Sequence, residues 1–426
     1  MRASRGAEEE TVHITLLHYA APPVVGGVET VIGHQAQQLN RAGHNVRILA
    51  GRGKTWDAHI PVSILPLLDS RHPRILKAKA SLDAGQVPDD FDDLVNRIQE
   101  DLIQALNDCE ILIAHNVLSL HKNLALTAAL YRISQETTKP RLIAWHHDPA
   151  WTSPRYLPEL HDGYPWDLLR TALPNVRQVT ISDARQTEIA RLFKIAPSEI
   201  DVIPAGLDLA DFFNLHQDTQ HLAEKLPLYS SGPILLTPVR LTRRKNIELA
   251  LGTLAELKSA YPAAALIVTG PPGAHNPTNA DYFNELHKLR ADLHLQDSAH
   301  LLAEFFPEGL PESSIPDYYR LCDLLFLPSR EEGFGIPILE AGLTGMPIFC
   351  SDLPALRSLA GSRANYFHPD DSPRQIAGMI DAYIQSNPVA QLRMQVRQHL
   401  PDANRLSVVT ATILLAYALT PFVKLP

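Results

Sequence analysis

Short apolar segments typical of β-strands alternate with amphipathic helical segments along most of this chain. Strands are expected in the first half at residues 12–19, 45–51, 61–68, 109–116, 140–147, 177–182 and 199–204. More are expected in the second half at residues 232–240, 264–270, 300–305, 322–328, 346–351 and 363–368. Continuous apolar strands separated by helices are typical of parallel sheets covered on both faces. The pattern therefore predicts an α/β protein with two doubly wound domains.

The chain length agrees with two domains. The chain has 426 residues, whereas single hydrophobic cores stop growing near roughly 250–300 residues. We expect an N-terminal domain over residues 11–210 and a C-terminal domain over residues 211–405, with the linker around residues 206–231. The uncharged segment 406–423 is predicted to be a terminal helix that packs back on the N-terminal domain, with a membrane contact as the alternative.

Composition narrows the class of protein. Hydrophobic residues make up 45% and charged residues 20%, which excludes disordered, collagen-like and coiled-coil chains. The net charge of -9 argues against a nucleic-acid partner. The three cysteines form no C-x-x-C pair, so we expect buried free thiols rather than zinc ligands or disulfides. With no apolar signal segment at the N-terminus, a cytoplasmic location is expected, with the inner membrane surface left open.

Residues 329–352 carry the most informative local pattern. Glu332 is followed by the turn Gly333, Phe334, Gly335, and a helix is predicted to start near Ile336. Free N–H groups at a helix start favour an anion. Glu332 could accept hydrogen bonds from sugar hydroxyls, and Glu340, about one turn inside the helix, could reach a ribose. The alternative is an ordinary strand-loop-helix corner with solvated carboxylates.

Two further segments follow predicted strands. Arg240 ends one strand and Lys245 lies near the start of the next helix, which is a suitable place for a phosphate. A solvated basic turn is the alternative. Gly26 and Gly27 open the first helix and would allow a phosphate or a sugar to approach the backbone, although the loop lacks the G-x-G-x-x-G spacing.

Histidines end two strands of the first half. His146 and His147 close one strand, and because neighbours on a strand face opposite sides, we expect one of them to face the ligand edge. Asp148 could orient a histidine, and His115 ends the preceding strand. The basic stretch 71–79 is expected to be a solvated loop, with contact to an anionic acceptor or a membrane as the alternative.

Taken together, these segments resemble the retaining glycosyltransferases of GT-B architecture in family 4, also called glycosyl transferases group 1. The resemblance rests on EEGFGIPILEAGLTGMPIFCSD, VRLTRRKN, GGVET and VIPAGLDLADFF, where Ala205 replaces the family's usual Asn. It extends from about residue 12 to about residue 400. It implies two Rossmann-like domains facing each other across a cleft, the N-terminal one binding the acceptor and the C-terminal one the nucleotide-sugar donor.

The resemblance also implies roles for the residues named above. Glu332 would bind the donor sugar, Glu340 the ribose, and Arg240 with Lys245 the diphosphate. His147, or else His146, would contact the transferred sugar. The implied donor-binding set is Gly26, Gly27, Arg240, Lys245, Glu332, Gly333, Phe334, Gly335, Ile336 and Glu340, of which Arg240, Lys245 and Glu332 act in catalysis together with His147.

The implied activity is transfer of a hexose of the glucose or mannose type from a UDP- or GDP-sugar to a hydroxyl. The acceptor would be a glycan, a lipid-linked sugar or a small molecule. We find no convincing D-x-D metal motif, so no metal or other cofactor is expected, because two cations and a helix N-terminus could stabilise the leaving group. The alternatives are another GT-B enzyme, such as a sugar-nucleotide epimerase, and a non-catalytic paralogue that binds nucleotide sugars or glycans.

Overall fold

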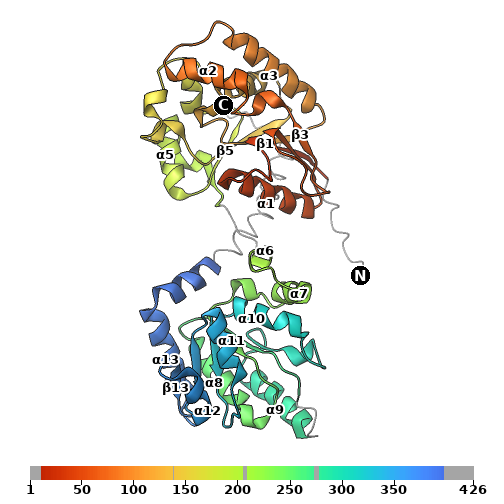
Figure 1. Cartoon of the computed structure of the whole chain (residues 1–426), viewed down its shortest axis with the longest axis vertical. Coiled ribbons are helices and arrows are strands. Elements are labelled where there is room, and N and C mark those ends of the chain that lie inside the picture. Colours follow the sequence, from red (N-terminus) through yellow and green to blue (C-terminus); the bar gives the residue numbers. More distant parts are fainter. Residues whose placement is uncertain (1–10, 138, 205–208, 273–277, 398–426) are drawn as a thin grey trace, which may run out of the picture. The chain divides into compact units, whose positions relative to one another are not determined.

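The computed structural model describes residues 11–137, 139–204, 209–272 and 278–397. It divides into two compact units, and the described residues up to 204 form the first and those from 209 onward the second (Figure 1). Each unit has its own parallel sheet. The two doubly wound domains predicted from the strand and helix pattern are therefore confirmed. The acceptor and donor roles of the domains, and the cleft between them, stay predictions.

The first unit is built on a seven-stranded sheet in the order β3-β2-β1-β4-β5-β6-β7, with every neighbouring pair parallel. Its strands are β1 (His13–Ala20), β2 (Asn45–Arg52), β3 (Val62–Ile64), β4 (Ile111–His115), β5 (Arg141–His146), β6 (Arg177–Thr180) and β7 (Ile200–Val202). Its helices are α1 (Gly27–Arg41), α2 (Pro73–Asp83), α3 (Phe91–Ala105), α4 (Leu124–Glu136) and α5 (Asp183–Phe193).

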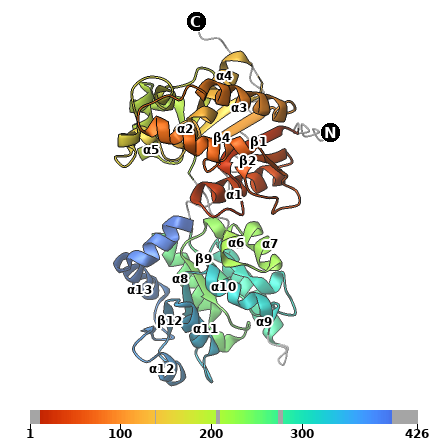
Figure 2. The same ribbon diagram turned by 45° about the horizontal axis from the view of Figure 1, so that its top comes forward.

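Side-chain alternation along the strands gives this sheet two apolar faces. In β1, Leu16 packs into the core that contains Ile32 of α1, whereas its neighbour Leu17 packs into the core that contains Ile98 of α3. On this second face α3 and α4 lie side by side (Figure 2). Helices cover both faces, so the central strands are buried along nearly their whole length.

The second unit has a six-stranded parallel sheet in the order β10-β9-β8-β11-β12-β13. Its strands are β8 (Ile234–Thr237), β9 (Ala265–Val268), β10 (Ala299–Leu301), β11 (Leu324–Leu327), β12 (Ile348–Ser351) and β13 (Asn365–Phe367). Its helices are α6 (Leu209–Phe213), α7 (Gln217–Lys225), α8 (Ile247–Leu257), α9 (Thr278–Asp292), α10 (Ile315–Leu321), α11 (Ile336–Thr344), α12 (Pro354–Ala360) and α13 (Pro373–Ser386).

Every predicted strand position contains a strand, but most strands are shorter than predicted, and in two segments a 3-10 turn replaces part of the strand. Only Val62–Ile64 of the segment 61–68 is a strand, because Pro66 starts a 3-10 turn. In the segment 300–305, the chain leaves β10 after Leu301 and enters another 3-10 turn. Both segments are apolar, so their composition alone does not separate a strand from a buried turn.

Two predictions about loops are wrong. Most of the basic stretch 71–79 lies in α2, where Pro73 occupies the first turn and the His72 side chain accepts a hydrogen bond from the N–H of Arg74. The predicted linker 206–231 contains α6 and α7, whose Leu222 and other apolar residues pack into the second core. The predicted helix 406–423 lies outside the described residues.

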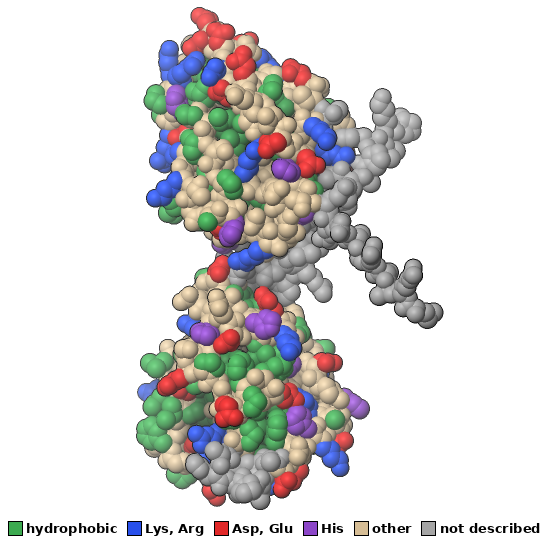
Figure 3. Space-filling view, turned by 90° about the vertical axis from the view of Figure 1, so that its right-hand side faces the viewer, with side chains coloured by type: hydrophobic (Ala, Val, Ile, Leu, Met, Phe, Trp, Pro, Cys, Tyr) green, Lys and Arg blue, Asp and Glu red, His purple; other side chains and the backbone are tan. Residues whose placement is uncertain are grey.

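The distribution of surface charge and the state of the cysteines agree with what the composition predicts. On the face drawn in Figure 3, basic side chains are interspersed with acidic ones rather than gathered into one basic surface. Cys109, Cys322 and Cys350 are buried and free, as predicted. Burial raises the pKa of the Cys350 thiol to about 12, so that thiol is unreactive at neutral pH. In the described part of the chain, no helix combines the length and the apolar character needed to cross a membrane.

Buried histidines make a testable prediction about stability and pH. Burial lowers the pKa of His18, His115, His121, His146, His147 and His300 below the ordinary value of 6.5. The unfolded chain therefore takes up protons at a pH where the folded chain does not. Stability should be full above about pH 6.5 and should fall below it, by up to about 1.4 kcal/mol per pH unit for each histidine.

The melting temperature measured between pH 7.5 and pH 5 tests this. The fall should be smaller in His146→Gln and unchanged in the exposed control His221→Gln. Carboxylates with a lowered pKa, such as Glu159, act mainly below this window, because the unfolded chain protonates them around their ordinary pKa of 4.5. A melting temperature that does not change between pH 7.5 and pH 5 would contradict the prediction.

Candidate functional site

The carboxyl edge of the second sheet brings two functional segments together. β8 and β11 are neighbours in the centre of the sheet. The next strand after β8 in the chain, β9, lies on one side of this pair, and the next strand after β11, β12, lies on the other. This is a topological switch point, where ligands bind in open α/β sheets. The loops after β8 and β11 leave the sheet side by side and are joined by a main-chain hydrogen bond of 2.8 Å from Arg330 N to Arg244 O.

An ion pair links the two loops at their centre. Lys245 Nζ, from the 3-10 turn Arg243–Lys245, lies 2.5 Å from Glu332 Oε2. Only 9% of the Lys245 side chain and 12% of the Glu332 side chain are exposed. A charge at this depth is costly unless it is paired, so each residue stabilises the other. In the structure, the residue predicted to bind phosphate, Lys245, therefore contacts the residue predicted to bind the sugar, Glu332.

Arg240 differs from Lys245 in its surroundings. It is exposed, and its guanidinium has no hydrogen bond or ion pair within the part of the chain that the structure describes. Its backbone, however, is closely packed: a Cβ atom on Gly270 would lie 2.7 Å from the Arg240 Cα atom and 2.3 Å from the Val239 carbonyl oxygen. Because position 270 is a glycine, the loop after β9 can pack against the backbone of Arg240. The Arg240 guanidinium itself remains exposed.

The glycine turn leads into α11, which begins at Ile336 as predicted. Gly335 has a φ of +97°, a conformation that favours glycine. A Cβ atom there would also lie 2.5 Å from Leu356 Cδ2, whereas one on Gly333 would meet nothing within 4 Å. Phe334 and Ile336 are 56% and 59% exposed. No side chain caps the helix. Pro337 has no N–H, and the N–H of Ile338 donates to the Gly335 carbonyl oxygen at 2.9 Å, which leaves the N–H of Ile336 for a ligand at the helix start.

Glu340 lies one turn further along α11 and has a partner that the sequence reasoning missed. The hydroxyl of Tyr319, on α10, donates a hydrogen bond of 2.5 Å to Glu340 Oε2. Tyr319 is only 2% exposed. In the sequence it stands beside Tyr318, which is also buried, and no local signal distinguishes the two.

The corresponding edge of the first sheet carries buried histidines, with the carboxylates of Glu29 and Asp148 nearby. β1 and β4 are neighbours at its switch point, and His18 and His115 lie near their ends. His18 Nδ1 donates to the His115 carbonyl oxygen at 2.8 Å, and His115 Nδ1 lies 3.1 Å from His147 Nε2. His115 Nε2 lies 2.9 Å from Gln35 Oε1 of α1. If that oxygen accepts, His115 is protonated on Nε2 and its Nδ1 accepts a hydrogen bond from the Nε2–H of His147.

The doubled histidine is resolved by its contacts. His146 Nε2 lies 2.8 Å from Gln178 Oε1, and its ring packs edge-on against Phe193 of α5. His147, next along the chain, contacts His115 instead. Burial lowers the pKa of His147 to about 4, so its imidazole is neutral at pH 7. Of the two, His147 belongs to the strand edge and His146 to the protein interior.

Asn116 fixes the chain around His147. Its φ of +62° turns the side chain back toward β5, and its Oδ1 accepts hydrogen bonds from the backbone N–H groups of His147 and Asp148, at 3.0 and 2.9 Å. Its Nδ2 donates to Asp148 Oδ2 at 3.2 Å. Asp148 is thus engaged with Asn116, and none of the described hydrogen bonds joins it to a histidine ring.

Gly26 and Gly27 lie at the start of α1, after β1. A Cβ atom on Gly27 would meet nothing within 4 Å, and one on Gly26 would meet only the Glu29 carboxylate. The neighbouring Val25 is 99% exposed. Packing within the described protein does not require these glycines, and the surface above them is accessible.

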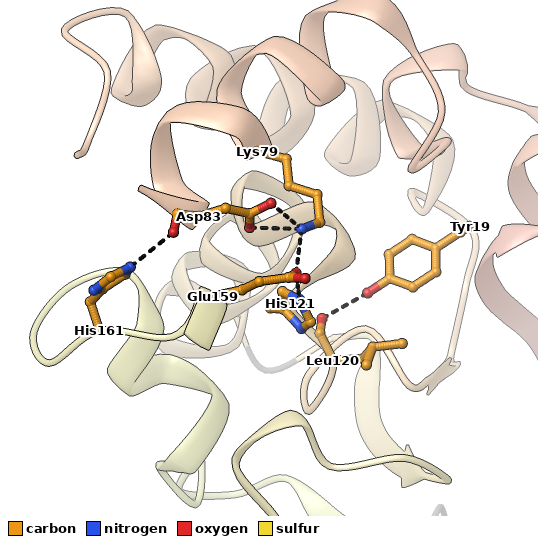
Figure 4. Close-up of polar contacts among 7 residues, drawn as sticks. All are labelled: Tyr19, Lys79, Asp83, Leu120, His121, Glu159 and His161. Carbon is orange, nitrogen blue, oxygen red and sulfur yellow. Dashed lines mark hydrogen bonds and ion pairs between the residues drawn. The ribbon is translucent and has the colours of Figure 1, made fainter. Parts of the chain in front are cut away.

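One group of side chains among the described residues has the composition of a metal site: Asp83, His121 and Glu159. Figure 4 shows that Lys79 lies among them. Its Nζ donates to Asp83 at 2.5 Å and to Glu159 at 2.8 Å, and His121 Nε2 lies 2.5 Å from Glu159. Lys79 supplies the positive charge that the carboxylates need. The group is thus explained as an ion-pair network that joins α2 to the segments around His121 and Glu159.

The turn before α11 gives a second testable prediction. Gly335→Ala places a side chain at a positive φ and against Leu356, and should cost about 1–3 kcal/mol of unfolding free energy. Gly333→Ala is the matched control in the same turn and should change stability by less than about 0.5 kcal/mol. Urea unfolding of the two variants makes the comparison, and equal stabilities would contradict it.

Two family models match the chain and leave only its ends and a short central gap uncovered. Residues 25–211 match the model described as Glycosyltransferase Family 4. Residues 218–399 match the model described as Glycosyl transferases group 1. The matches correspond to the two structural units and contain the site residues described above except His18.

Individual relatives agree with the family models. The mannosylglucosylglycerate synthase of Petrotoga mobilis is 26% identical, over 81% of this chain and 84% of its own. The MMP alpha-(1->4)-mannosyltransferase of Mycolicibacterium hassiacum is 23% identical, over 82% and 83%. The D-inositol 3-phosphate glycosyltransferase of Jonesia denitrificans is 26% identical, and the chain spans about half of that relative's length, 52%.

A solved glycosyltransferase structure from Rickettsia africae aligns with 96% of this chain and 99% of its own, at 18% identity and a TM-score of 0.35. That likeness is too low to add to the argument. The family models and the two parallel sheets carry it: the chain belongs to the family 4 glycosyltransferases and has their two-domain GT-B fold.

Proposed function

We propose that this protein is a retaining hexosyltransferase that moves a glucose- or mannose-type sugar from a UDP- or GDP-sugar to a hydroxyl acceptor. The observation that carries the proposal is the grouping of Lys245, Glu332 and the open start of α11 at one strand edge. Two relatives, named as an inositol 3-phosphate glycosyltransferase and a mannosylglucosylglycerate synthase, favour transfer of a hexose to a hydroxyl.

The electrostatics of the second domain suit a diphosphate leaving group. Negative charge builds up on the diphosphate as the bond to the sugar breaks. Lys245 supplies a point charge and Arg240 a planar, accessible guanidinium. The start of α11, with the free N–H of Ile336, adds the positive end of a helix dipole. These fixed charges stabilise the leaving group, and we propose that turnover needs no divalent metal.

The Lys245–Glu332 pair also suggests how the site could recognise the diphosphate and the sugar of the donor at the same time. In the structure each side chain neutralises the other. On donor binding, the phosphates replace Glu332 as the partner of Lys245, and sugar hydroxyls then donate to Glu332. Lys245 then pairs with the phosphates and the Glu332 carboxylate keeps hydrogen bonds from the sugar, so neither side chain is left without a polar partner.

The first domain contributes neutral groups. We propose that His147 contacts the transferred sugar and that Gly26 and Gly27 line the pocket beside it. A neutral imidazole suits this task because it can exchange hydrogen bonds with a hydroxyl without attracting the diphosphate. In the retaining reaction, the acceptor hydroxyl attacks from the face that the leaving group vacates, and a departing phosphate oxygen takes its proton. No enzyme nucleophile is then required.

The proposal predicts metal-independent release of nucleotide diphosphate from one donor in a panel of UDP- and GDP-sugars. Arg240→Ala and Lys245→Ala should each lower the rate roughly 10²–10³-fold. Arg243→Ala is the matched control, because Arg243 lies in the same turn but is exposed and paired with Glu285. Its rate should stay within about twofold of wild type if the diphosphate lies where proposed.

Arg240→Ala is the sharper of the two variants, since removal of an exposed side chain leaves no buried charge behind. A Lys245→Ala or Arg240→Ala enzyme with normal turnover would refute the assignment of the diphosphate site. A folded wild-type protein that binds a donor but turns over none, with or without acceptors, would favour the non-catalytic paralogue. Conversion of the donor to another nucleotide sugar without an acceptor would favour the epimerase.

A further inference from the structure

The hydrogen bond between Tyr319 and Glu340 has a property that packing alone does not explain. A phenylalanine would fill the space of the Tyr319 ring, which is 2% exposed. The hydroxyl instead reaches from α10 to the carboxylate of Glu340 on α11. Placing a hydroxyl at such depth is costly unless it is hydrogen-bonded, and here the single partner is an ionisable group that is itself partly exposed.

Tyr319 can act toward Glu340 only as a donor. Burial, and after it the hydrogen bond and negative charge of Glu340, raise the pKa of the Tyr319 hydroxyl far above its usual range. The phenol therefore stays protonated, and its proton always points at Oε2. Among the described residues no other group donates to the Glu340 carboxylate. Oε1 and one lone pair of Oε2 are left for a ligand.

Position along α11 indicates which part of a ligand would reach that oxygen. Glu340 is four residues beyond Ile336, the first residue of the helix, which places it about 6 Å further along the helix axis. The helix start and Lys245 suit the diphosphate, as argued above. A carboxylate about one turn away suits the pair of hydroxyls on the ribose, because both hydroxyls are donors.

We propose that Tyr319 is a positioning residue that holds the Glu340 carboxylate ready to accept the ribose hydroxyls of the nucleotide donor. The inference rests on the proposed function and adds to it a residue that makes no contact with the nucleotide. A free glutamate side chain loses rotamer freedom on binding, and that loss weakens the binding of the nucleotide. Tyr319 removes much of that cost before the nucleotide arrives.

The test compares nucleotides with and without ribose hydroxyls. Calorimetry with UDP, GDP and their 2′,3′-dideoxy forms should show Tyr319→Phe binding the ribonucleotide about 5–20-fold more weakly than wild type. Its affinity for the dideoxy form should equal that of wild type. In turnover, the KM for the donor should rise by the same factor while kcat is unchanged, because the ribose contact is equal in the ground and transition states.

Tyr318→Phe is the matched control, since Tyr318 neighbours Tyr319 on α10 and is equally buried. It should leave the ratio of ribose to dideoxy affinity as in wild type. In a Glu340→Gln background, Tyr319→Phe should have a smaller effect, because the charged partner is gone. Thermal unfolding of each variant shows whether the ring packing is kept.

Three results would overturn the inference. Tyr319→Phe could bind both nucleotide forms with wild-type affinity, which would show that the hydroxyl does not assist binding. It could also lose affinity for both forms equally, which would indicate a structural role only. Loss of cooperative unfolding in Tyr319→Phe would likewise show that the hydroxyl maintains the fold. A folded wild-type protein that binds neither UDP nor GDP is distinguishable from these, because it refutes the proposed function itself.

Discussion

The ion pair between Lys245 and Glu332 is the interaction on which the proposed site depends. It exists because β8 and β11 are parallel neighbours whose carboxyl ends meet at one edge, although 87 residues separate the two side chains. The glycines at 270 and 335 let the surrounding loops approach this edge closely. Two charges that are nearly buried can persist there because each neutralises the other, and a diphosphate sugar offers both a replacement partner.

The two sheets use the same topology with different chemistry. At the switch point of the second sheet the side chains are charged, which suits a diphosphate. At the switch point of the first sheet they are neutral imidazoles, held by one another and by Gln35. Burial keeps His147 uncharged at neutral pH, so this edge suits hydroxyls rather than phosphates. The contrast supports a division of labour in which the second domain holds the nucleotide and the first holds what reacts with it.

How much the sequence predicts depends on whether a feature is local. Strand positions were predictable because buried parallel strands are continuous apolar runs. The placement of Lys245 and Glu332 at one sheet edge follows from their positions after strands, and their roles as ligands stay predictions. The helix α2 was missed because its exposed basic residues obscure a face formed by Ile75 and Leu82. Tyr319, Gln35 and Asn116 were missed because their roles come from partners on other elements, which no local pattern records.

A crystal structure of the protein with a bound nucleotide diphosphate would test the central claim most directly, through the distance between Lys245 Nζ and Glu332 Oε2. The account predicts that this distance, 2.5 Å in the present structure, increases as a phosphate oxygen comes within hydrogen-bonding distance of Lys245. The diphosphate should lie at the start of α11. A nucleotide bound elsewhere on the second domain, with the Lys245–Glu332 pair intact, would contradict the account.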